Sequence, residues 1–184
     1  MIPFKQSPNF TPGNFKPIGF VIHGTLGNYD GAVNWLCTPP EKRNPVSYSS
    51  AHFVIAKDGR ATQLVECTNQ SWHAGTVSNP SVYAQSVLPK GATGYKNPNE
   101  SFVGIELEWF VGDDVTPAQY DRIMEIIQQV GIKNPVLIGH TDIASYKSDD
   151  MEFACKMIRN RLGGSIRDAI SKIEEALTIL KAKL

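Results

Sequence analysis

The sequence lacks an excess of charge of either sign and any long apolar run. Its 184 residues include 18 basic and 18 acidic side chains. A chain without net charge has no positive field to hold it on nucleic acid or anionic lipid. No apolar run is long enough to span a bilayer, and the first residues lack the apolar core of a signal peptide. We therefore expect a chain made in the cytoplasm, with no transmembrane segment and no nucleic-acid partner.

Closely paired cysteines are also missing. The three cysteines, Cys37, Cys67 and Cys155, are odd in number and far apart in the sequence. This spacing excludes a zinc ribbon, a redox motif and a disulfide framework, and it favours free thiols in a reducing compartment. With 41% apolar residues, the chain has the length and composition of one globular domain.

Short apolar runs bounded by glycine, proline or polar residues predict the strands. Residues 16–23 and 136–140 each form such a run and each ends in a histidine, so we expect His23 at the exposed end of its strand. Two further runs, 52–57 and 60–66, flank Asp58-Gly59, a strong hairpin signal. Residues 101–110 predict one more strand.

The helices follow from capping signals and apolar spacing. Thr116-Pro117-Ala118-Gln119 combines an N-cap, a proline at the first helical position and a capping-box glutamine, and helical spacing continues to Gly131. Residues 31–37 and 149–162 predict further helices, whereas residues 76–100 show little period and predict a long surface loop. Strands interleaved with helices predict a single α/β domain with a mixed central sheet flanked by helices.

The last twenty residues differ from the rest of the chain. Behind Ser165, apolar residues recur at alternating steps of four and three, which predicts an amphipathic helix over residues 165–184. This helix either packs on the domain's own surface or mediates self-association or contact with the cell envelope. The sequence therefore predicts a main domain over residues 1–164 with an added C-terminal helix.

The four histidines lie where strands or apolar segments end: His23, His52, His73 and His140. A catalytic zinc ion needs three ligands of the histidine or carboxylate type and one open position for water, whose pKa it lowers to about 7. Residues 140–149 supply one imidazole, two possible carboxylates and a lysine. Spacing alone does not select three ligands, and on chemistry alone His52 competes equally with His23.

A resemblance to a known family rests on five segments in a fixed order. They are Val21-Ile-His23-Gly-Thr25, Ser50-Ala-His52-Phe-Val-Ile55, Trp72-His73-Ala-Gly75, Gly104-Ile-Glu106-Leu-Glu108 and Gly139-His140-Thr-Asp142-Ile-Ala144. Together they resemble the type-2 zinc N-acetylmuramoyl-L-alanine amidases. That family includes a bacterial cytoplasmic muropeptide amidase, phage endolysins and animal peptidoglycan recognition proteins. Its enzymes cut the amide bond between the lactyl group of muramic acid and the first alanine of the peptidoglycan stem peptide.

The resemblance implies that His23, His140 and Asp149 bind Zn2+, with no organic cofactor. The loop before Lys147 is one residue shorter than in the cytoplasmic muropeptide amidase, and Asp150-Met151 replaces the Pro-Gly that commonly follows. Asp150 is therefore a rival ligand. We prefer to interpret it as an acidic residue at the N-terminus of the next helix, where the helix dipole favours a negative charge.

The catalytic base is also implied by the resemblance. Some members place a tyrosine before the histidine of the second segment, while others use the first glutamate of the Gly-Ile-Glu segment. This chain has Ala51 at the first place and Glu106 at the second, so Glu106 is the candidate base. Lys147 is expected to stabilise the negative charge that develops on the carbonyl oxygen. Alternation along the strand places Glu108 on the same face as Glu106.

The remaining site residues concern the substrate. The resemblance implies that Trp72, His73 and Asn99 line the groove for peptidoglycan or a muropeptide, and we interpret His52 as a structural histidine hydrogen-bonded beneath the metal. Three functions compete: a phage or prophage endolysin that reaches the wall after release, a cytoplasmic anhydromuropeptide-recycling amidase, and a non-catalytic peptidoglycan-binding protein. The long segment 76–100 and the added C-terminal helix favour the endolysin.

Overall fold

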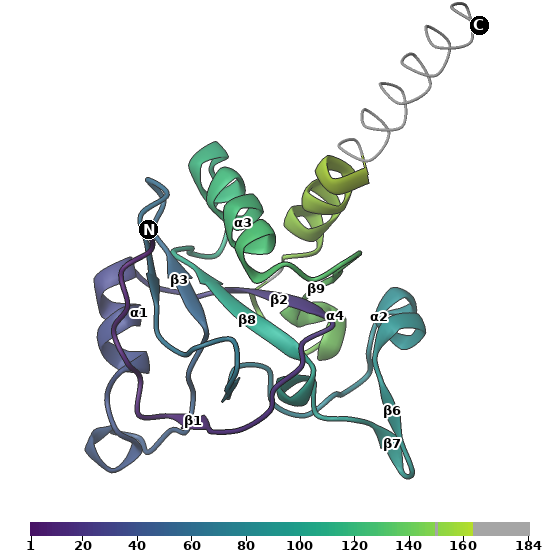
Figure 1. Cartoon of the computed structure of the whole chain (residues 1–184), viewed down its shortest axis with the longest axis horizontal. Coiled ribbons are helices and arrows are strands. Elements are labelled where there is room, and N and C mark those ends of the chain that lie inside the picture. Colours follow the sequence, from purple (N-terminus) through teal and green to yellow (C-terminus); the bar gives the residue numbers. More distant parts are fainter. Residues whose placement is uncertain (150, 164–184) are drawn as a thin grey trace, which may run out of the picture.

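A five-stranded sheet with strand order β4-β3-β8-β2-β9 lies at the centre of the fold (Figure 1). The computed structural model describes residues 1–149 and 151–163. The strands are β1 (Phe10–Thr11), β2 (Gly19–Gly24), β3 (Phe53–Ile55), β4 (Ala61–Gln63), β5 (Gln70–Ser71), β6 (Lys90–Gly91), β7 (Gly94–Tyr95), β8 (Phe102–Leu107) and β9 (Val136–Gly139). The helices are α1 (Tyr29–Leu36), η1 (Pro40–Lys42), α2 (Val82–Val87), η2 (Pro98–Glu100), α3 (Pro117–Val130) and α4 (His140–Ile143), and residues 152–163 are also helical.

The sheet is mixed, as the sequence predicts. Strand β2 pairs in parallel with both β8 and β9, and β3 pairs in parallel with β8. Only β4 runs against its neighbour, because it forms the predicted hairpin with β3 around Asp58-Gly59. Gly59 has φ +84°, a left-handed conformation that favours glycine in such a turn.

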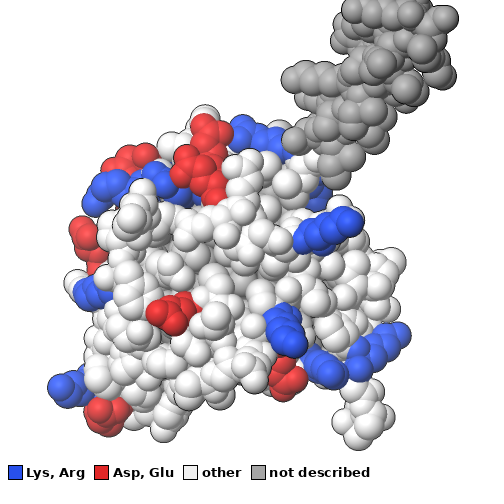
Figure 2. All heavy atoms as spheres, in the orientation of Figure 1, with Lys and Arg blue, Asp and Glu red and all other residues white. Residues whose placement is uncertain are grey.

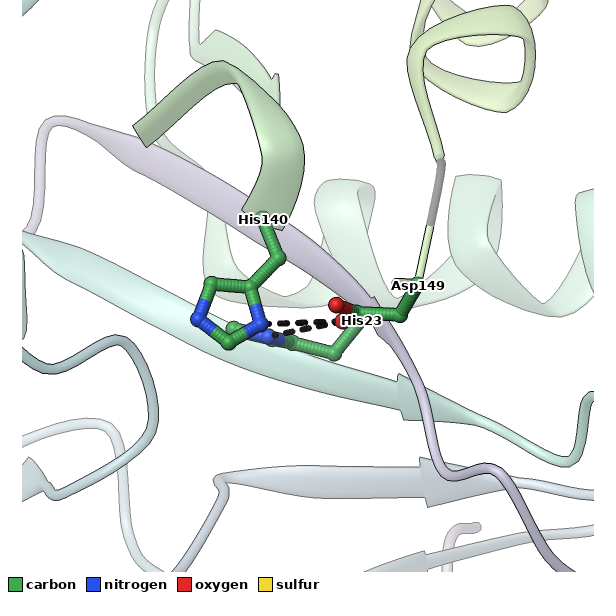
Figure 3. Close-up of side chains that lie close together, drawn as sticks. All are labelled: His23, His140 and Asp149. Atoms are coloured by element: carbon green, nitrogen blue, oxygen red, sulfur yellow. Dashed lines mark hydrogen bonds and ion pairs between the residues drawn. The ribbon is translucent and has the colours of Figure 1, made fainter. Parts of the chain in front are cut away.

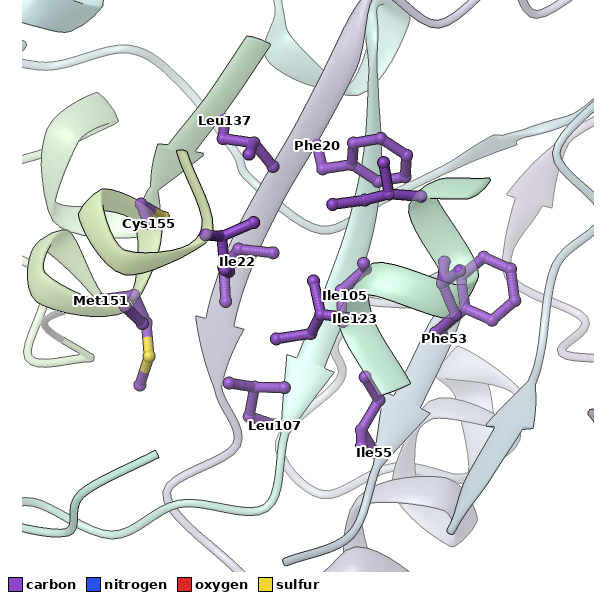
Figure 4. Packing of buried hydrophobic residues seen from close by; sticks show 14 of the residues in the cluster. Phe20, Ile22, Phe53, Ile55, Ile105, Leu107, Ile123, Leu137, Met151 and Cys155 are labelled. Carbon is purple, nitrogen blue, oxygen red and sulfur yellow. The ribbon is translucent and has the colours of Figure 1, made fainter. Parts of the chain in front are cut away.

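One face of the sheet carries the larger apolar core. Alternate residues of the strands, such as Phe20 and Ile22 of β2, point to the same side and are fully buried. Helix α3 and residues 152–163 cover this side with apolar residues that include Ile123 and Cys155 (Figure 4). The strands therefore present continuous apolar stripes on this face of the sheet.

The opposite face is divided into two smaller apolar clusters. Val54 of β3 packs with buried residues of α1, while Val21 of β2 and Ile138 of β9 pack with residues of α2 and α4. Between these clusters the same face presents His23 from β2 and Glu106 from β8. Strand alternation thus places the chemically active side chains on the face that the helices cover only in part.

The capping signals predict α3 correctly. Thr116 Oγ1 accepts a hydrogen bond from the Gln119 backbone N–H at 3.1 Å, and the Gln119 side chain accepts one from the Thr116 N–H at 3.0 Å. The helix ends at Gly131 with φ 72°. Helix α1 begins two residues before the predicted Gly31, because Asn28 Oδ1 accepts from the Gly31 N–H at 2.7 Å and caps it.

Residues 76–100 lie mostly at the surface, as predicted, but the prediction of a loop without helices or strands is wrong. This segment contains α2, the 3₁₀ helix η2 and the small antiparallel pair of β6 and β7. Ser81 caps α2 by accepting from the Ala84 N–H at 3.1 Å, and its hydroxyl donates to Asp142 Oδ1 at 2.6 Å. The segment is therefore tied to α4 next to the site.

The predicted helix 165–184 and the domain boundary before it lie outside the described residues, so both stay predictions. None of the three cysteines forms a disulfide bond, and only Cys155 is fully buried. Among residues 1–149 and 151–163, no helix has the length and apolar character needed to cross a bilayer.

Candidate metal centre and active site

Three chemically active side chains lie at the carboxyl ends of adjacent parallel strands. His23 of β2 is in register with Glu106 of β8, and His140 directly follows β9 on the other side of β2. The carboxyl ends of parallel strands are where α/β sheets commonly bind ligands. The expectation that His23 is exposed is wrong, since only 1% of its surface is accessible. Neighbouring elements cover the strand end, although His23 still borders a pocket.

Asp149 joins the two histidines from the segment that follows α4 (Figure 3). Its Oδ2 lies 2.9 Å from His140 Nδ1 and 3.6 Å from His23 Nδ1. One ligand atom from each of the three residues lies within 4.8 Å of the others. Ligands of a tetrahedral zinc ion are separated by about 3.3 Å, which lies between the two measured distances. Two imidazoles and one carboxylate at this spacing fit a zinc ion.

The protonation states also suit a metal. Burial lowers the pKa of His23 to about 4, so its imidazole is neutral near pH 7. Burial alone would raise the pKa of Asp149, but hydrogen bonds with His140 and His23 hold that pKa well below its ordinary range. Neutral imidazole and ionised carboxylate are the forms that bind metal ions. The rival ligand Asp150 lies outside the described residues.

Glu106 and Lys147 border the same pocket as the three clustered residues. Burial, reinforced by the negative charge of Asp149, raises the pKa of Glu106 to about 8, while the positive charge of Lys147 opposes the shift. A carboxyl group with a pKa near neutral is suited to exchange protons with a reacting group. The structure therefore brings together five residues proposed from the sequence as ligands, base and charge stabiliser.

The pocket has a volume of about 550 Å³ and extends from the cluster along α1. Sequence reasoning missed the residues of this extension, among them Leu26, Trp35 and Ser49. The buried residues of α1 are Tyr29, Val33 and Leu36, and Trp35 lies off that stripe with 40% of its surface exposed. A tryptophan outside the apolar stripe of a helix was the signal that could have identified it.

The three predicted substrate residues do not belong to the described lining of this pocket. The Trp72 indole N–H donates to Thr11 Oγ1 at 2.9 Å. His73 is 9% exposed and its Nδ1 lies 2.9 Å from His23 Nε2. Asn99 is 6% exposed, and its Oδ1 accepts from the backbone N–H of His73. These residues lie behind or beside the cluster.

Two polar residues have structural partners. His52 is fully buried; its Nε2 donates to the Asn69 carbonyl at 3.0 Å, and its Nδ1 accepts from the Gly104 N–H at 3.0 Å. The sequence interpretation of His52 as a hydrogen-bonded structural residue fits these contacts. Asp142, the other carboxylate considered near His140, accepts from the Gly139 N–H at 2.9 Å and from Ser81.

The fold and the site define an α/β domain with a two-histidine, one-aspartate cluster of the type that holds a catalytic metal. The family model for N-acetylmuramoyl-L-alanine amidases matches residues 13–152, and the chain belongs to that family. The resemblance identified in the sequence is thereby confirmed. The matched range contains His23, His140 and Asp149.

Individual relatives agree with this assignment. The 1,6-anhydro-N-acetylmuramyl-L-alanine amidase AmpD of Haemophilus influenzae is 32% identical over 106 residues. This alignment covers 55% of the chain and spans 50% of the relative's length. A solved AmpD structure superposes with a TM-score of 0.58 at 22% identity, covering 79% of this chain and 84% of that one. The endolysine amidase LysCS of Clostridium intestinale superposes with a TM-score of 0.54 at 18% identity, covering 89% and 95%.

We expect the His23→Ala variant to lose tight zinc binding, because it removes one of three ligands. Zinc content after dialysis, measured by atomic emission, checks this. A chelator should remove the ion from the wild-type protein, and added zinc should restore it. The His52→Asn variant is the control and should retain zinc. Tight binding of one zinc ion by His23→Ala would show that the ligand assignment is wrong.

The raised pKa of Glu106 predicts a pH-dependent stability in the metal-free protein. Its folded pKa of about 8 exceeds the ordinary value of 4.5, so the folded state binds the proton more tightly than the unfolded state. Stability from this group is therefore present below pH 4.5 and is lost as the pH rises to about 8.

Melting temperatures of the metal-free wild type and the Glu106→Gln variant, measured from pH 4.5 to 8.5, check this prediction. As the pH rises, the melting temperature of the wild type should fall relative to that of the variant by at least about 2–4 °C. This is the shift that about 1 kcal/mol of stability causes in a domain of this size. Added zinc should shrink the difference, since a cation stabilises the carboxylate. Parallel curves for the two metal-free proteins would contradict the assigned pKa.

Proposed function

We propose that the protein is a zinc-dependent amidase that cuts the bond between the lactyl group of N-acetylmuramic acid and the L-alanine of the stem peptide. The observation that carries this proposal is the placement of His23, His140 and Asp149 with Glu106 and Lys147 around one pocket. Membership of the amidase family supports the bond that is cut. Retention of a complete donor set beside an acid–base residue argues against a non-catalytic binding protein.

The residues of the pocket divide the chemistry among them. His23, His140 and Asp149 would hold a zinc ion, which when bound would supply Lewis acidity toward the amide carbonyl and lower the pKa of water. Glu106 accepts a proton from the attacking water and delivers it to the alanine nitrogen as the carbon–nitrogen bond breaks. Lys147 places a positive charge near the carbonyl oxygen as negative charge develops there.

The extension of the pocket along α1 suits a neutral sugar. Apart from the three clustered residues, Glu106 and Lys147, the described lining of the pocket contains apolar and uncharged polar residues and no charged one. Trp35 offers an aromatic surface there, and the Arg43 guanidinium lies 5.0 Å from the centre of its ring. Arg43 donates hydrogen bonds to Thr38, Ser47 and Ser49, which fixes the neighbouring rim. A rigid aromatic wall with few polar groups is typical of small-molecule sites.

Among the candidate substrates, we favour a soluble 1,6-anhydromuropeptide over intact cell wall. The curated relatives at about 30% identity are named as 1,6-anhydro-N-acetylmuramyl-L-alanine amidases. The endolysine structure shares less than 25% identity and supports the fold alone. The phage endolysin, which the sequence analysis favoured, thus becomes the second candidate function. One reason for favouring it was the long segment 76–100, and this reason is weaker because the segment is a folded part of the domain.

The surface charge is consistent with a small or neutral substrate. Figure 2 shows blue and red side chains interspersed over one face, with large uncharged areas between them. The whole chain carries 18 basic and 18 acidic residues. Such a surface provides no net field for nucleic acid. Self-association through residues 165–184 stays a separate prediction.

We expect the Glu106→Gln variant to keep its zinc and to lose hydrolysis by about 10²-fold or more, the usual effect of removing a general acid–base group. Initial rates on a purified muropeptide, together with zinc content, check this. The matched control is Glu108→Gln. Glu108 Oε2 accepts from the Lys57 backbone N–H at 2.9 Å, so this change should affect stability more than rate. Equal losses of hydrolysis rate in the Glu106→Gln and Glu108→Gln variants would contradict the proposed role of Glu106 as the general base.

A direct comparison of substrates separates the two candidate functions. We expect the zinc-loaded protein to turn over soluble 1,6-anhydromuropeptide with a kcat/KM at least 10-fold above that for fragments carrying a reducing-end muramic acid, and to release little peptide from intact sacculi. Released stem peptide, quantified by liquid chromatography, is the measurement. Faster release from sacculi than from the soluble substrate would favour the endolysin. Hydrolysis of neither substrate would contradict the proposed function.

A further inference from the structure

Both histidines of the metal cluster are held from behind by one short segment, His73-Ala74. His23 Nε2 lies 2.9 Å from His73 Nδ1. His140 Nε2 lies 3.2 Å from the Ala74 carbonyl oxygen. In both imidazoles, the nitrogen that faces this segment is the one remote from Asp149. Two neighbouring residues therefore contact both histidines on the side away from the proposed metal.

Two backbone carbonyl groups, which can only accept hydrogen bonds, fix which ring nitrogen of each histidine donates. The Ala74 carbonyl accepts, so His140 donates through Nε2–H, which is the tautomer that has its lone pair on Nδ1. His73 Nε2 lies 3.0 Å from the Phe102 carbonyl and must likewise donate. A neutral imidazole has one N–H donor and one acceptor nitrogen, so with Nε2 donating to Phe102 the His73 Nδ1 is the acceptor. His23 consequently donates through Nε2–H.

These hydrogen bonds determine which nitrogen atoms of His23 and His140 face the metal cluster. In the tautomer with Nε2 protonated on both rings, Nδ1 of His23 and Nδ1 of His140 each carry the lone pair that a metal ion would bind, and both atoms lie near Asp149 Oδ2. Asp149 Oδ2 and the two Nδ1 atoms then form a set of three electron-pair donors. The Nδ1 atom of His140 lies 2.9 Å from this oxygen, and that of His23 lies 3.6 Å from it. Such an arrangement is stable with a cation between the donors. The tautomer set by His73 is thus the one that a metal ion requires.

The segment is itself held by dedicated contacts. Asn99 Oδ1 accepts from the backbone N–H groups of both His73 and Ala74, at 3.0 and 2.8 Å. Beneath the His73 ring lies Gly104, where an added Cβ would come within 2.5 Å of His73 Cγ. Because glycine has no side chain, Gly104 leaves the space in which the His73 ring packs against the sheet. These contacts fix the ring in one position.

We propose that His73 is a positioning residue that fixes the tautomer and orientation of His23 for metal binding through Nδ1, and that Asn99 supports His73 and Ala74 in this role. The inference rests on the metal site of the proposed function. It gives His73 and Asn99 a role different from the substrate contacts that the family resemblance implies. It also explains why both are buried outside the pocket that the substrate would enter.

Zinc affinity tests the proposal without any assay of hydrolysis. In the His73→Leu variant, His23 loses its acceptor, and we expect the zinc dissociation constant, measured by competition with a chelator, to rise by about 10–100-fold. The His73→Asn variant places an amide oxygen near the Nδ1 position and should recover part of this loss. The matched control is His52→Leu, because His52 is equally buried but bonds to Asn69 and Gly104. It should lower the melting temperature and change zinc affinity less than about 3-fold.

A second measurement keeps the proposal testable if His73→Leu does not fold. Histidine nitrogen NMR of the zinc-loaded wild type should show Nε2–H on His23 and on His73, with an unprotonated Nδ1 on His73. A proton on His73 Nδ1, or unchanged zinc affinity in folded His73→Leu, would overturn the proposal. Zinc binding that depends on His73 in a protein that hydrolyses no muropeptide would instead refute the proposed function alone.

Discussion

The parallel registry of β2 with β8 and β9 is the constraint on which the site depends. It places His23 beside Glu106 and brings His140 to the same edge of the sheet. Alternation then decides which face each side chain uses, so Ile22 and Ile105 enter the core while His23 and Glu106 face the pocket. A shift of one residue in β2 would bury His23 in the apolar core and expose Ile22 in its place.

A polar cluster in this position requires partners for its buried nitrogen atoms. Each unsatisfied buried donor or acceptor costs about 1–3 kcal/mol. Carbonyl groups of Ala74, Phe102 and Asn69 accept from the imidazoles of His140, His73 and His52, respectively. His140, His73 and His52 are thus satisfied by backbone carbonyls and His23 by the His73 side chain, which leaves the Nδ1 atoms of His23 and His140 that face Asp149 for a ligand. Support of this kind holds a site in one geometry before the ligand arrives.

Local patterns sufficed for the elements whose signals lie within a few residues, such as the capping box of α3 and the hairpin at Asp58-Gly59. Motif order sufficed to group His23, His140 and Asp149 with Glu106 and Lys147, but it did not identify the pocket lining along α1, such as Trp35. The positions of Trp72, His73 and Asn99 were not predictable, because whether a side chain faces the pocket or the back of His23 depends on how distant segments pack. Helix α2 was missed because six residues show too little periodicity to identify a helix.

The third member of the cluster depends on packing far from the pocket. Asp149 lies just before Met151, which is buried in the apolar core together with Ala154, Cys155 and Ile158. The segment approaches the sheet closely: a Cβ added at Gly24 would come within 2.9 Å of Met151 Cε, and one at Gly139 within 3.3 Å of Met151 Cβ. Because Gly24 and Gly139 have no side chain, the segment that carries Asp149 can pack closely against the strand ends. Apolar packing of residues 152–163 holds this segment against the strand ends, and a metal ion bound by Asp149 and the two histidines would hold it there as well. Under the proposed function, such an ion would therefore stabilise the folded domain in addition to its role in the reaction.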